Sequence, residues 1–286
     1  MTSAISSFLP SDFDPSQPVA VVAGQRDYPK ATVAAIRAAG VPVRLIALAG
    51  ETDPALVETF AEDEVAHIKV GQIGRMLKGL KRVQARYAIF VGQVTPGKLF
   101  KDLHPDLKAL AMLAKLKERN AHTIFGSIAH EIEAIGVRML DARAFIDNSL
   151  ASTGLMTGGR QKADPEQIAY GVRMAKEIAR LDIGQGVVVR KGTVLAVEAF
   201  EGTDDMLQRA NKYKTDKLVF VKTTRPNQNP YFDWPVFGPK TIESMQASGI
   251  GTAALEADKV VMLDKEKLIE SARSAGIELI GYESTD

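Results

Sequence analysis

The side chains best suited to chemistry gather in the C-terminal half of the chain, between residues 181 and 238. The first group follows an apolar strand and consists of Glu198, Glu201, Gly202, Thr203 and Asp204. Carboxylates at the carboxyl end of a strand, just ahead of a helix, can supply oxygen ligands to Mg²⁺. A plainer interpretation stays open, because helix caps are far more common than metal sites: Thr203 or Asp204 caps the helix and the other acids are solvated.

The second group lies in a long loop with four prolines, together with the last residue of the strand before it. Its polar members are Lys222, Thr223, Thr224, Arg225, Gln228, Asn229 and Asp233. Lysine, arginine and threonine side chains suit phosphate oxygens, while Asp233 can bind a metal or orient water for attack on phosphorus. The combination favours phosphoryl or nucleotidyl chemistry. The alternative is a surface loop of turn-forming residues in which Arg225 pairs with Asp233.

A third candidate lies near the start of the chain, where an apolar run from residue 18 ends at Gly24. A helix and a second strand follow, which is the opening of a doubly wound nucleotide-type fold with its ligand crevice beside the glycine. One glycine is not the GxGxxG pattern, so a simple turn from strand to helix is the commoner explanation. Gln93 ends another strand at the same expected edge, and His104 follows in a loop.

The elements that must position these residues alternate along the chain. In the first half, strands are predicted at residues 18–24, 43–48, 64–68, 87–92 and 137–139, with helices at 31–39, 73–82, 106–116 and 123–135. In the second half, strands are predicted at residues 186–190, 194–199, 218–222, 252–255, 259–263 and 277–280, with helices at 165–181, 206–210, 241–248 and 265–275. This alternation is typical of an α/β protein.

The length and a small, glycine-rich stretch near residue 150 divide the chain into two domains. We predict an N-terminal extension over residues 1–18, an N-terminal α/β domain over 19–148, a linker over 149–163 and a C-terminal α/β domain over 164–286. The first domain is expected to have a Rossmann-like parallel sheet, and the second a mixed sheet with the main site motifs. The extension either frays or clamps onto a neighbour.

Composition excludes several classes of function. With 36 basic and 35 acidic side chains, the protein has no overall field that would steer it onto nucleic acid. It has no cysteine and four histidines without ligand spacing, so any metal is expected to be held by oxygen atoms. No apolar run is long enough to cross a bilayer, and the N-terminus lacks the pattern of an export signal.

The run LDIGQGVVVRKGTVLAVEAFEGTDDML, residues 181–207, closely resembles the signature of the LpxI-type UDP-2,3-diacylglucosamine pyrophosphatases of lipid A biosynthesis. The pieces FVGQVTP, LHPD, PNQN, FDWP and VFGPKTIE also follow in that family's order. The resemblance implies a cytoplasmic enzyme, built from two α/β domains with the substrate between them, that hydrolyses its nucleotide-lipid substrate to UMP and 2,3-diacylglucosamine 1-phosphate. It further implies a Mg²⁺ cofactor, a homodimer and peripheral contact with a membrane.

The EGTD motif and the loop from Lys222 to Asp233 motivate a working hypothesis in which Asp233 holds Mg²⁺ with help from Asp204 or Glu201. Lys222 and Arg225 neutralise the phosphate oxygens while water attacks phosphorus. The residues implied in substrate binding are Gly24, Gln93, Glu198, Glu201, Gly202, Thr203, Arg225, Gln228 and Asn229. The diacylated substrate also implies an apolar groove, for which the candidates are Leu155, Met156, Met206, Phe232, Trp234 and Phe237.

The chain departs from the family pattern at Asn229, where an aspartate is usual. Two other functions therefore stay open: a non-catalytic relative that binds a nucleotide sugar or lipid phosphate, and a hydrolase of another nucleotide diphosphate compound.

Overall fold

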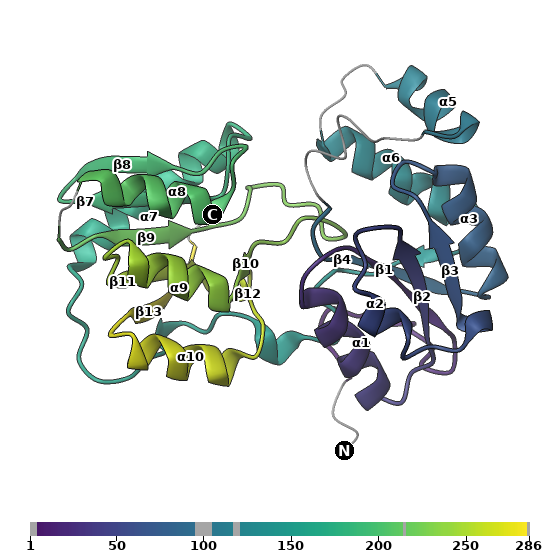
Figure 1. Cartoon of the computed structure of the whole chain (residues 1–286), viewed down its shortest axis with the longest axis horizontal. Coiled ribbons are helices and arrows are strands. Elements are labelled where there is room, and N and C mark those ends of the chain that lie inside the picture. The colour runs from purple at the N-terminus through teal and green to yellow at the C-terminus, as the bar shows by residue number, and fades with distance from the viewer. Residues whose placement is uncertain (1–4, 95–104, 117–120, 214–215, 285–286) are drawn as a thin grey trace. The chain divides into compact units, whose positions relative to one another are not determined.

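The computed structural model describes residues 5–94, 105–116, 121–213 and 216–284, and it consists of two compact units (Figure 1). Unit 1 comprises Met1–Asp147 and the short segment Asn229–Asp233. Unit 2 comprises Asn148–Gln228 and Trp234–Asp286. Each unit has its own sheet covered by helices, which confirms the predicted α/β class.

Unit 1 is built on a five-stranded parallel sheet with the order β3-β2-β1-β4-β5. Its strands are β1 (Val19–Ala23), β2 (Val43–Leu48), β3 (Val65–Ile68), β4 (Tyr87–Val91) and β5 (Arg138–Met139). The central strands β1 and β4 are unbroken apolar runs because helices bury both faces of a parallel sheet. The order reverses between β1 and β4, as in Rossmann folds, so the parallel Rossmann-like sheet is confirmed.

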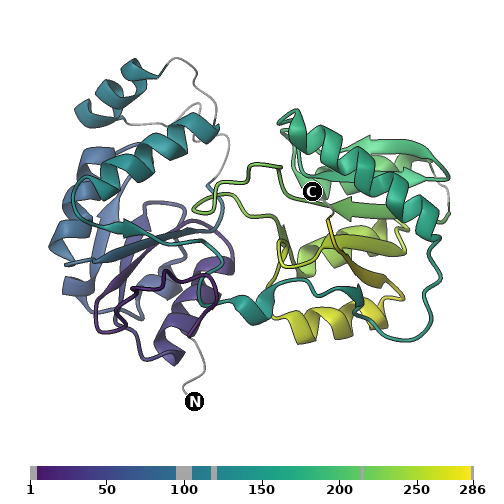
Figure 2. The same cartoon turned by 180° about the vertical axis from the view of Figure 1, so that it is seen from behind.

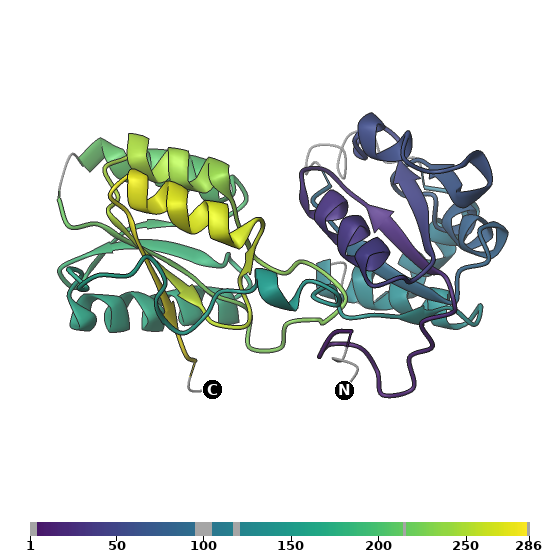
Figure 3. The same ribbon diagram turned by 90° about the horizontal axis from the view of Figure 1, so that it is seen from below.

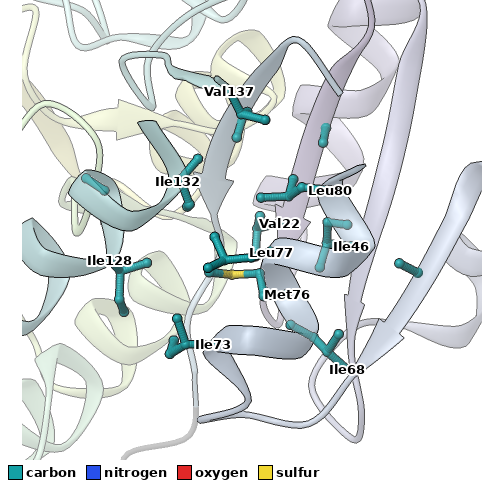
Figure 4. Packing of buried hydrophobic residues seen from close by; sticks show 14 of the residues in the cluster. Val22, Ile46, Ile68, Ile73, Met76, Leu77, Leu80, Ile128, Ile132 and Val137 are labelled. Atoms are coloured by element: carbon teal, nitrogen blue, oxygen red, sulfur yellow. The ribbon is translucent and has the colours of Figure 1, made fainter. Parts of the chain in front are cut away.

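The helices of unit 1 are α1 (Tyr28–Ala38), α2 (Pro54–Val57), α3 (Ile73–Arg82), α5 (Leu107–Lys115) and α6 (Ala121–Glu133). Helix α3 buries Ile73, Met76, Leu77 and Leu80, whose spacing of three and four residues forms one apolar face. That face points toward the sheet and toward Ile132 of α6 (Figure 4). The opposite face of α3 is left for solvent.

The described part of the N-terminal extension packs along unit 1. The Ser7 N–H and hydroxyl both donate to Asp147 Oδ1, over 2.7 and 2.6 Å. The ring of Phe13 lies 4.7 Å from that of Tyr87, centroid to centroid, and the Tyr87 hydroxyl accepts from the Asp14 N–H. Residues 5–18 are thus an integral layer of unit 1.

Unit 2 contains a six-stranded mixed sheet with the order β6-β13-β11-β9-β7-β8, as predicted. Strands β9 (Val219–Lys222), β11 (Thr252–Glu256) and β13 (Glu278–Tyr282) are parallel to one another. Strand β7 (Gly186–Arg190) runs antiparallel to β9 and to β8 (Thr193–Val197). At the other edge, β6 (Gly154–Leu155) lies within the segment predicted as a linker and pairs antiparallel with β13.

Helices cover both faces of this sheet (Figure 3). Helix α7 (Pro165–Arg180) packs on one face, while α8 (Thr203–Ala210), α9 (Pro239–Ala247) and α10 (Lys265–Ser274) pack on the other. A small parallel pair, β10 (Val236–Phe237) with β12 (Val261–Met262), completes the unit. Over the described residues, no helix is long and apolar enough to cross a membrane.

Candidate functional site

Three of the predicted residues meet at one edge of the unit 2 sheet. Lys222, the last residue of β9, directs its Nζ atom to Thr203 Oγ1 at 2.7 Å and to Glu198 Oε2 at 3.4 Å. The Thr203 hydroxyl in turn donates to Glu198 Oε1 over 2.5 Å. Lys222 is 4% exposed, so its ammonium is removed from water and needs these partners. We call Glu198, Thr203 and Lys222 the site triad.

Glycines make room for the carboxylate of the triad. The β7–β9 register places Gly186 opposite Lys222, and the Glu198 N–H donates to the Gly186 carbonyl. A Cβ atom on Gly186 would lie 2.6 Å from Glu198 Oε2, and one on Gly184 would lie 2.0 Å from the Glu198 carbonyl oxygen. The spacing of the two glycines therefore lets the Glu198 segment approach β7 closely.

The start of α8 differs from the prediction. Its N-cap is Gly202, with φ of 86°, and not Thr203 or Asp204. Only glycine adopts this backbone conformation at no steric cost. The Thr203 hydroxyl is consequently engaged with the triad instead of capping the helix, and the interpretation of this motif as a mere cap is wrong.

The sequence analysis missed Glu256, the last residue of β11. Its side chain is fully buried and accepts hydrogen bonds from Thr223 Oγ1 (2.6 Å), the Thr224 N–H (2.8 Å) and Lys176 Nζ (2.8 Å). Lys259 Nζ lies 2.9 Å from the same carboxylate. Burial alone would raise its pKa, but the hydrogen bonds from Lys176, Thr223 and Lys259 outweigh burial and lower the pKa of Glu256 to about 2.

Glu256 thus holds the two residues that follow Lys222 along the chain. From the other side, the Tyr282 hydroxyl donates to the Lys222 carbonyl oxygen over 3.2 Å, and burial raises the pKa of this tyrosine. The sequence did contain a signal for Glu256: an acidic residue ends the otherwise apolar strand TAALE. This strand ends at the same edge of the sheet as β9.

The polar loop after β9 is held at two points within unit 2. The Arg225 Nε atom donates to Asp182 Oδ1 over 2.6 Å, and the Gln228 side chain accepts from Gln185 Nε2 over 3.1 Å. The Gln185 carbonyl also accepts from the Thr223 N–H. Gln185 was not among the predicted site residues, although it lies between the two glycines of the signature.

The other acids of the EGTD motif face cations. Asp204 Oδ2 lies 3.1 Å from Lys240 Nζ at the start of α9. Glu201 is paired with Arg209 in the last turn of α8. Burial opposes the change, but hydrogen bonds including that of Arg209 lower the pKa of Glu201. Glu201 and Arg209 also line an open cavity of about 790 Å³ between β8 and α8.

Four predicted residues belong to unit 1. Gly24 directly follows β1 and lies next to Gln93, whose carbonyl oxygen would lie 2.6 Å from a Cβ atom at that glycine. The segment Asn229–Asp233 also belongs to unit 1, although Gln228 and Trp234 on either side of it belong to unit 2. Asn229 Oδ1 accepts from the Tyr231 N–H over 2.9 Å. His104 lies outside the described residues.

Phe232 anchors this segment in unit 1. It is 4% exposed and packs with ring centroids 4.7 Å from Phe125 and 4.9 Å from Phe90. Asp233 follows in a left-handed conformation, with φ of 58°, which aspartate tolerates better than most residues.

Of the six candidates for an apolar groove, three are core residues. Met206 and Phe237 are fully buried in the core under α8 and α9, and Phe232 belongs to the core of unit 1. Leu155 packs against the opposite face of the unit 2 sheet from Met156. Core packing explains Met206, Phe232 and Phe237, and a groove lined by these three side chains is not formed.

The predicted magnesium ligands do not form a metal site within either unit. Asp204 belongs to unit 2 and pairs with Lys240, whereas Asp233 belongs to unit 1. Within the described ranges, no group of three or more His, Asp or Glu side chains could hold a metal ion.

Comparison with known proteins agrees with this division of the chain. The model of the LpxI N-terminal domain matches residues 18–149, and that of the LpxI C-terminal domain matches residues 152–280. A protein of Caulobacter vibrioides named UDP-2,3-diacylglucosamine pyrophosphatase LpxI is 28% identical to the chain over 277 residues, which are 92% of this chain and 96% of the relative. Both domains of one family are matched in order, and the chain belongs to the LpxI family.

Proposed function

We propose that the protein hydrolyses the pyrophosphate bond of UDP-2,3-diacylglucosamine, in the lipid A pathway. One water molecule is consumed, and the products are UMP and 2,3-diacylglucosamine 1-phosphate. The observation that carries the proposal is the site triad, which lies in the segment matched by the family's C-terminal domain. The name of the Caulobacter relative supports the same substrate and reaction.

In this proposal Lys222 binds a phosphate oxygen of the substrate. An ammonium group has three N–H donors. Among the described residues, Lys222 directs two of its N–H groups to Thr203 and Glu198. The remaining donor can neutralise charge that develops on phosphorus oxygens in the transition state. The start of α8, whose first N–H groups lie beside Thr203, adds a positive dipole end at the same edge.

Glu198 positions the other two members of the triad. Each of its carboxylate oxygens accepts from a different partner, so the ammonium and the hydroxyl are fixed relative to each other. A preorganised charge of this kind needs no rearrangement during the reaction, which is the largest source of rate enhancement in many hydrolases.

The remaining parts of the expected mechanism stay predictions. Asp233 is proposed to act on the attacking water, with Asp204, Arg225, Gln228 and Asn229 contributing to substrate binding. Mg²⁺ is the cofactor that the resemblance implies, and chelation tests whether the reaction requires it. A cytoplasmic place of work, a homodimer and contact with a membrane are likewise expectations that the resemblance implies.

The test is an assay of the purified full chain with the substrate in detergent micelles, with release of UMP as the readout. We expect release of UMP by the wild type and loss of it in Lys222→Met. Tight binding of the substrate without UMP would contradict catalysis and favour a binding protein. Turnover of other UDP-sugars or dinucleotides, but not of the diacylated substrate, would contradict the proposed specificity.

A further inference from the structure

The solvent face of α3 in unit 1 is uniformly basic. Its four exposed residues are Arg75, Lys78, Lys81 and Arg82, and no acidic residue occurs in the helix. The apolar face of α3 points into the core (Figure 4), and the four cations are exposed to solvent. Residues three, four and seven positions apart share one side of a helix, which makes this a continuous stripe of charge.

A shallow cavity lies beside this stripe. Its volume is about 250 Å³, and its polar lining comes from His67 of β3 and from Arg75, Lys78 and Arg82 of α3. The Arg82 guanidinium also donates to the Val65 carbonyl, which fixes one wall. A hollow lined by cations without a carboxylate has the charge and size to accept an anionic headgroup.

Helix α5 adds an apolar surface next to the basic one. Leu107 is 86% exposed and Leu110 is 50% exposed, and with the exposed Ala111 and Ala114 they form an outward stripe. The inward face of α5 is apolar as well, with Ala109 and Met112 buried. The solvent side of α5 therefore combines this apolar stripe with the exposed Lys108 and Lys115, a pattern typical of a helix at a membrane interface.

The two faces are continuous. Asp106, which caps α5, accepts from the Arg75 N–H, so Leu107 begins directly beside the basic face of α3. Helix α5 lies at the periphery of unit 1, beyond α6, in both opposite views (Figures 1 and 2). Among the acids near this surface, Asp106 caps α5, Glu131 pairs with Lys108 at 2.6 Å and Glu64 pairs with Arg44 at 2.9 Å, while the exposed Glu62 and Asp63 precede β3.

We propose that the outer faces of α3 and α5 form a docking surface for an anionic lipid bilayer. The cations lie against the lipid headgroups, and Leu107 and Leu110 insert at the boundary of the acyl chains. This docking role rests on the proposed function, because a substrate with two acyl chains resides in a membrane. Nucleic acid would match the cations but leave the exposed leucines without a partner.

The test is flotation of the full chain with vesicles of phosphatidylcholine alone or with 30% phosphatidylglycerol. We expect binding to the anionic vesicles only, weakened by salt. The triple variant Arg75→Gln, Lys78→Gln and Lys81→Gln should bind about 100-fold more weakly, at about fivefold for each cation. The matched control Lys162→Gln, Lys191→Gln and Lys267→Gln removes three exposed cations of unit 2 and should bind as the wild type does.

The leucines are tested separately with Leu107→Ser and Leu110→Ser, which should lower binding to anionic vesicles without changing the melting temperature. Equal binding by the wild type and either variant, or none by the wild type, would overturn the proposal. Displacement of the vesicles by duplex DNA at equal charge would assign the face to nucleic acid. Turnover in detergent micelles should be unchanged in the variants. Release of UMP therefore tests the proposed reaction, and vesicle binding separately tests the docking surface.

Discussion

The Nζ atom of Lys222 lies 2.7 Å from Oγ1 of Thr203, and the same hydroxyl donates to Glu198. The ammonium ends a central strand, while the hydroxyl begins a helix that follows the edge strand β8. Two distant parts of the sequence thus meet because both lie at one edge of the unit 2 sheet. The contact brings a buried positive charge and a helix N-terminus to one place, as binding of a phosphate requires.

Replacing Lys222 with methionine should lower the turnover number by about 100-fold or more, because a charge aimed at the transition state is lost. The methionine retains the bulk of the side chain, so packing against Phe220 is kept. Release of UMP is the measurement, and Lys191→Met at an exposed turn is the control. Turnover within twofold of the wild type would remove Lys222 from the reaction.

Replacing Gly186 with alanine should displace Glu198. The new Cβ atom would lie 2.6 Å from Glu198 Oε2 and 3.0 Å from the Phe220 ring, so the carboxylate must move. We expect turnover to fall at least tenfold and the free energy of unfolding to fall by about 1–3 kcal/mol.

Gly251→Ala is the matched control, because a Cβ atom there meets nothing within 4 Å. If both alanine variants turn over substrate equally, the close approach of Glu198 to β7 has no role in the site.

Glu256 should make the stability of the protein depend on acid pH. Its pKa is about 2 in the folded protein, below the ordinary value of 4.5, so it stabilises the fold fully above pH 4.5 and loses that contribution as the pH falls toward 2. Glu256→Gln should therefore cost about 3 kcal/mol at pH 7, and the difference from the wild type should shrink below pH 4.5. Urea unfolding over a pH series measures it.

Glu270→Gln, at an exposed position of α10, is the control and should match the wild type at every pH. A constant difference between Glu256→Gln and the wild type from pH 7 to pH 3 would contradict the low pKa.

Local patterns were enough to predict most of the fold. The apolar spacing of Ile73, Met76 and Leu80 predicted α3 to the residue, and the mainly apolar run 43–48 predicted β2 with both of its ends. These signals depend on neighbours in sequence, which is why they are readable without the structure. The position of Gly202 at the N-cap was missed because a glycine cap has no side chain to reveal it.

Contacts between distant segments were not predictable in the same way. Glu256 looked like the end of a strand, and only the pairing of β11 with β9 brings it to Thr223 and Thr224. Likewise, the loop after Lys222 looked like one surface loop of the C-terminal domain. Its five central residues instead join unit 1, because Phe232 finds an aromatic pocket there.

Truncating Phe232 tests this anchor. Phe232→Ala removes a buried ring from the core of unit 1 and should cost about 3–5 kcal/mol in the free energy of unfolding. Phe232→Leu, which keeps much of the volume, should cost less. Because residue 233 is fixed by its neighbour, we also expect turnover of Phe232→Ala to fall at temperatures where the protein remains folded. Equal stability of the alanine variant and the wild type would contradict the burial of the ring.

Metal dependence and Asp233 are tested together. Treatment with EDTA should abolish release of UMP, and excess Mg²⁺ should restore it, if carboxylates from the motifs bind the ion as the family resemblance implies. Asp233→Asn is the sharper variant, because asparagine also tolerates the left-handed conformation that alanine would strain. We expect it to lower turnover at least 100-fold and leave the melting temperature unchanged.

Asp258→Asn is the matched control, since Asp258 has the same φ of 58° but lies outside the predicted site. Full turnover in EDTA would contradict the Mg²⁺ requirement while leaving Lys222 and Glu198 in place. Full turnover of Asp233→Asn would instead remove the carboxylate from the chemical step. In that case another carboxylate would have to activate the water. Glu198 already accepts hydrogen bonds from Thr203 and Lys222, so Glu198→Gln would be the first variant to test.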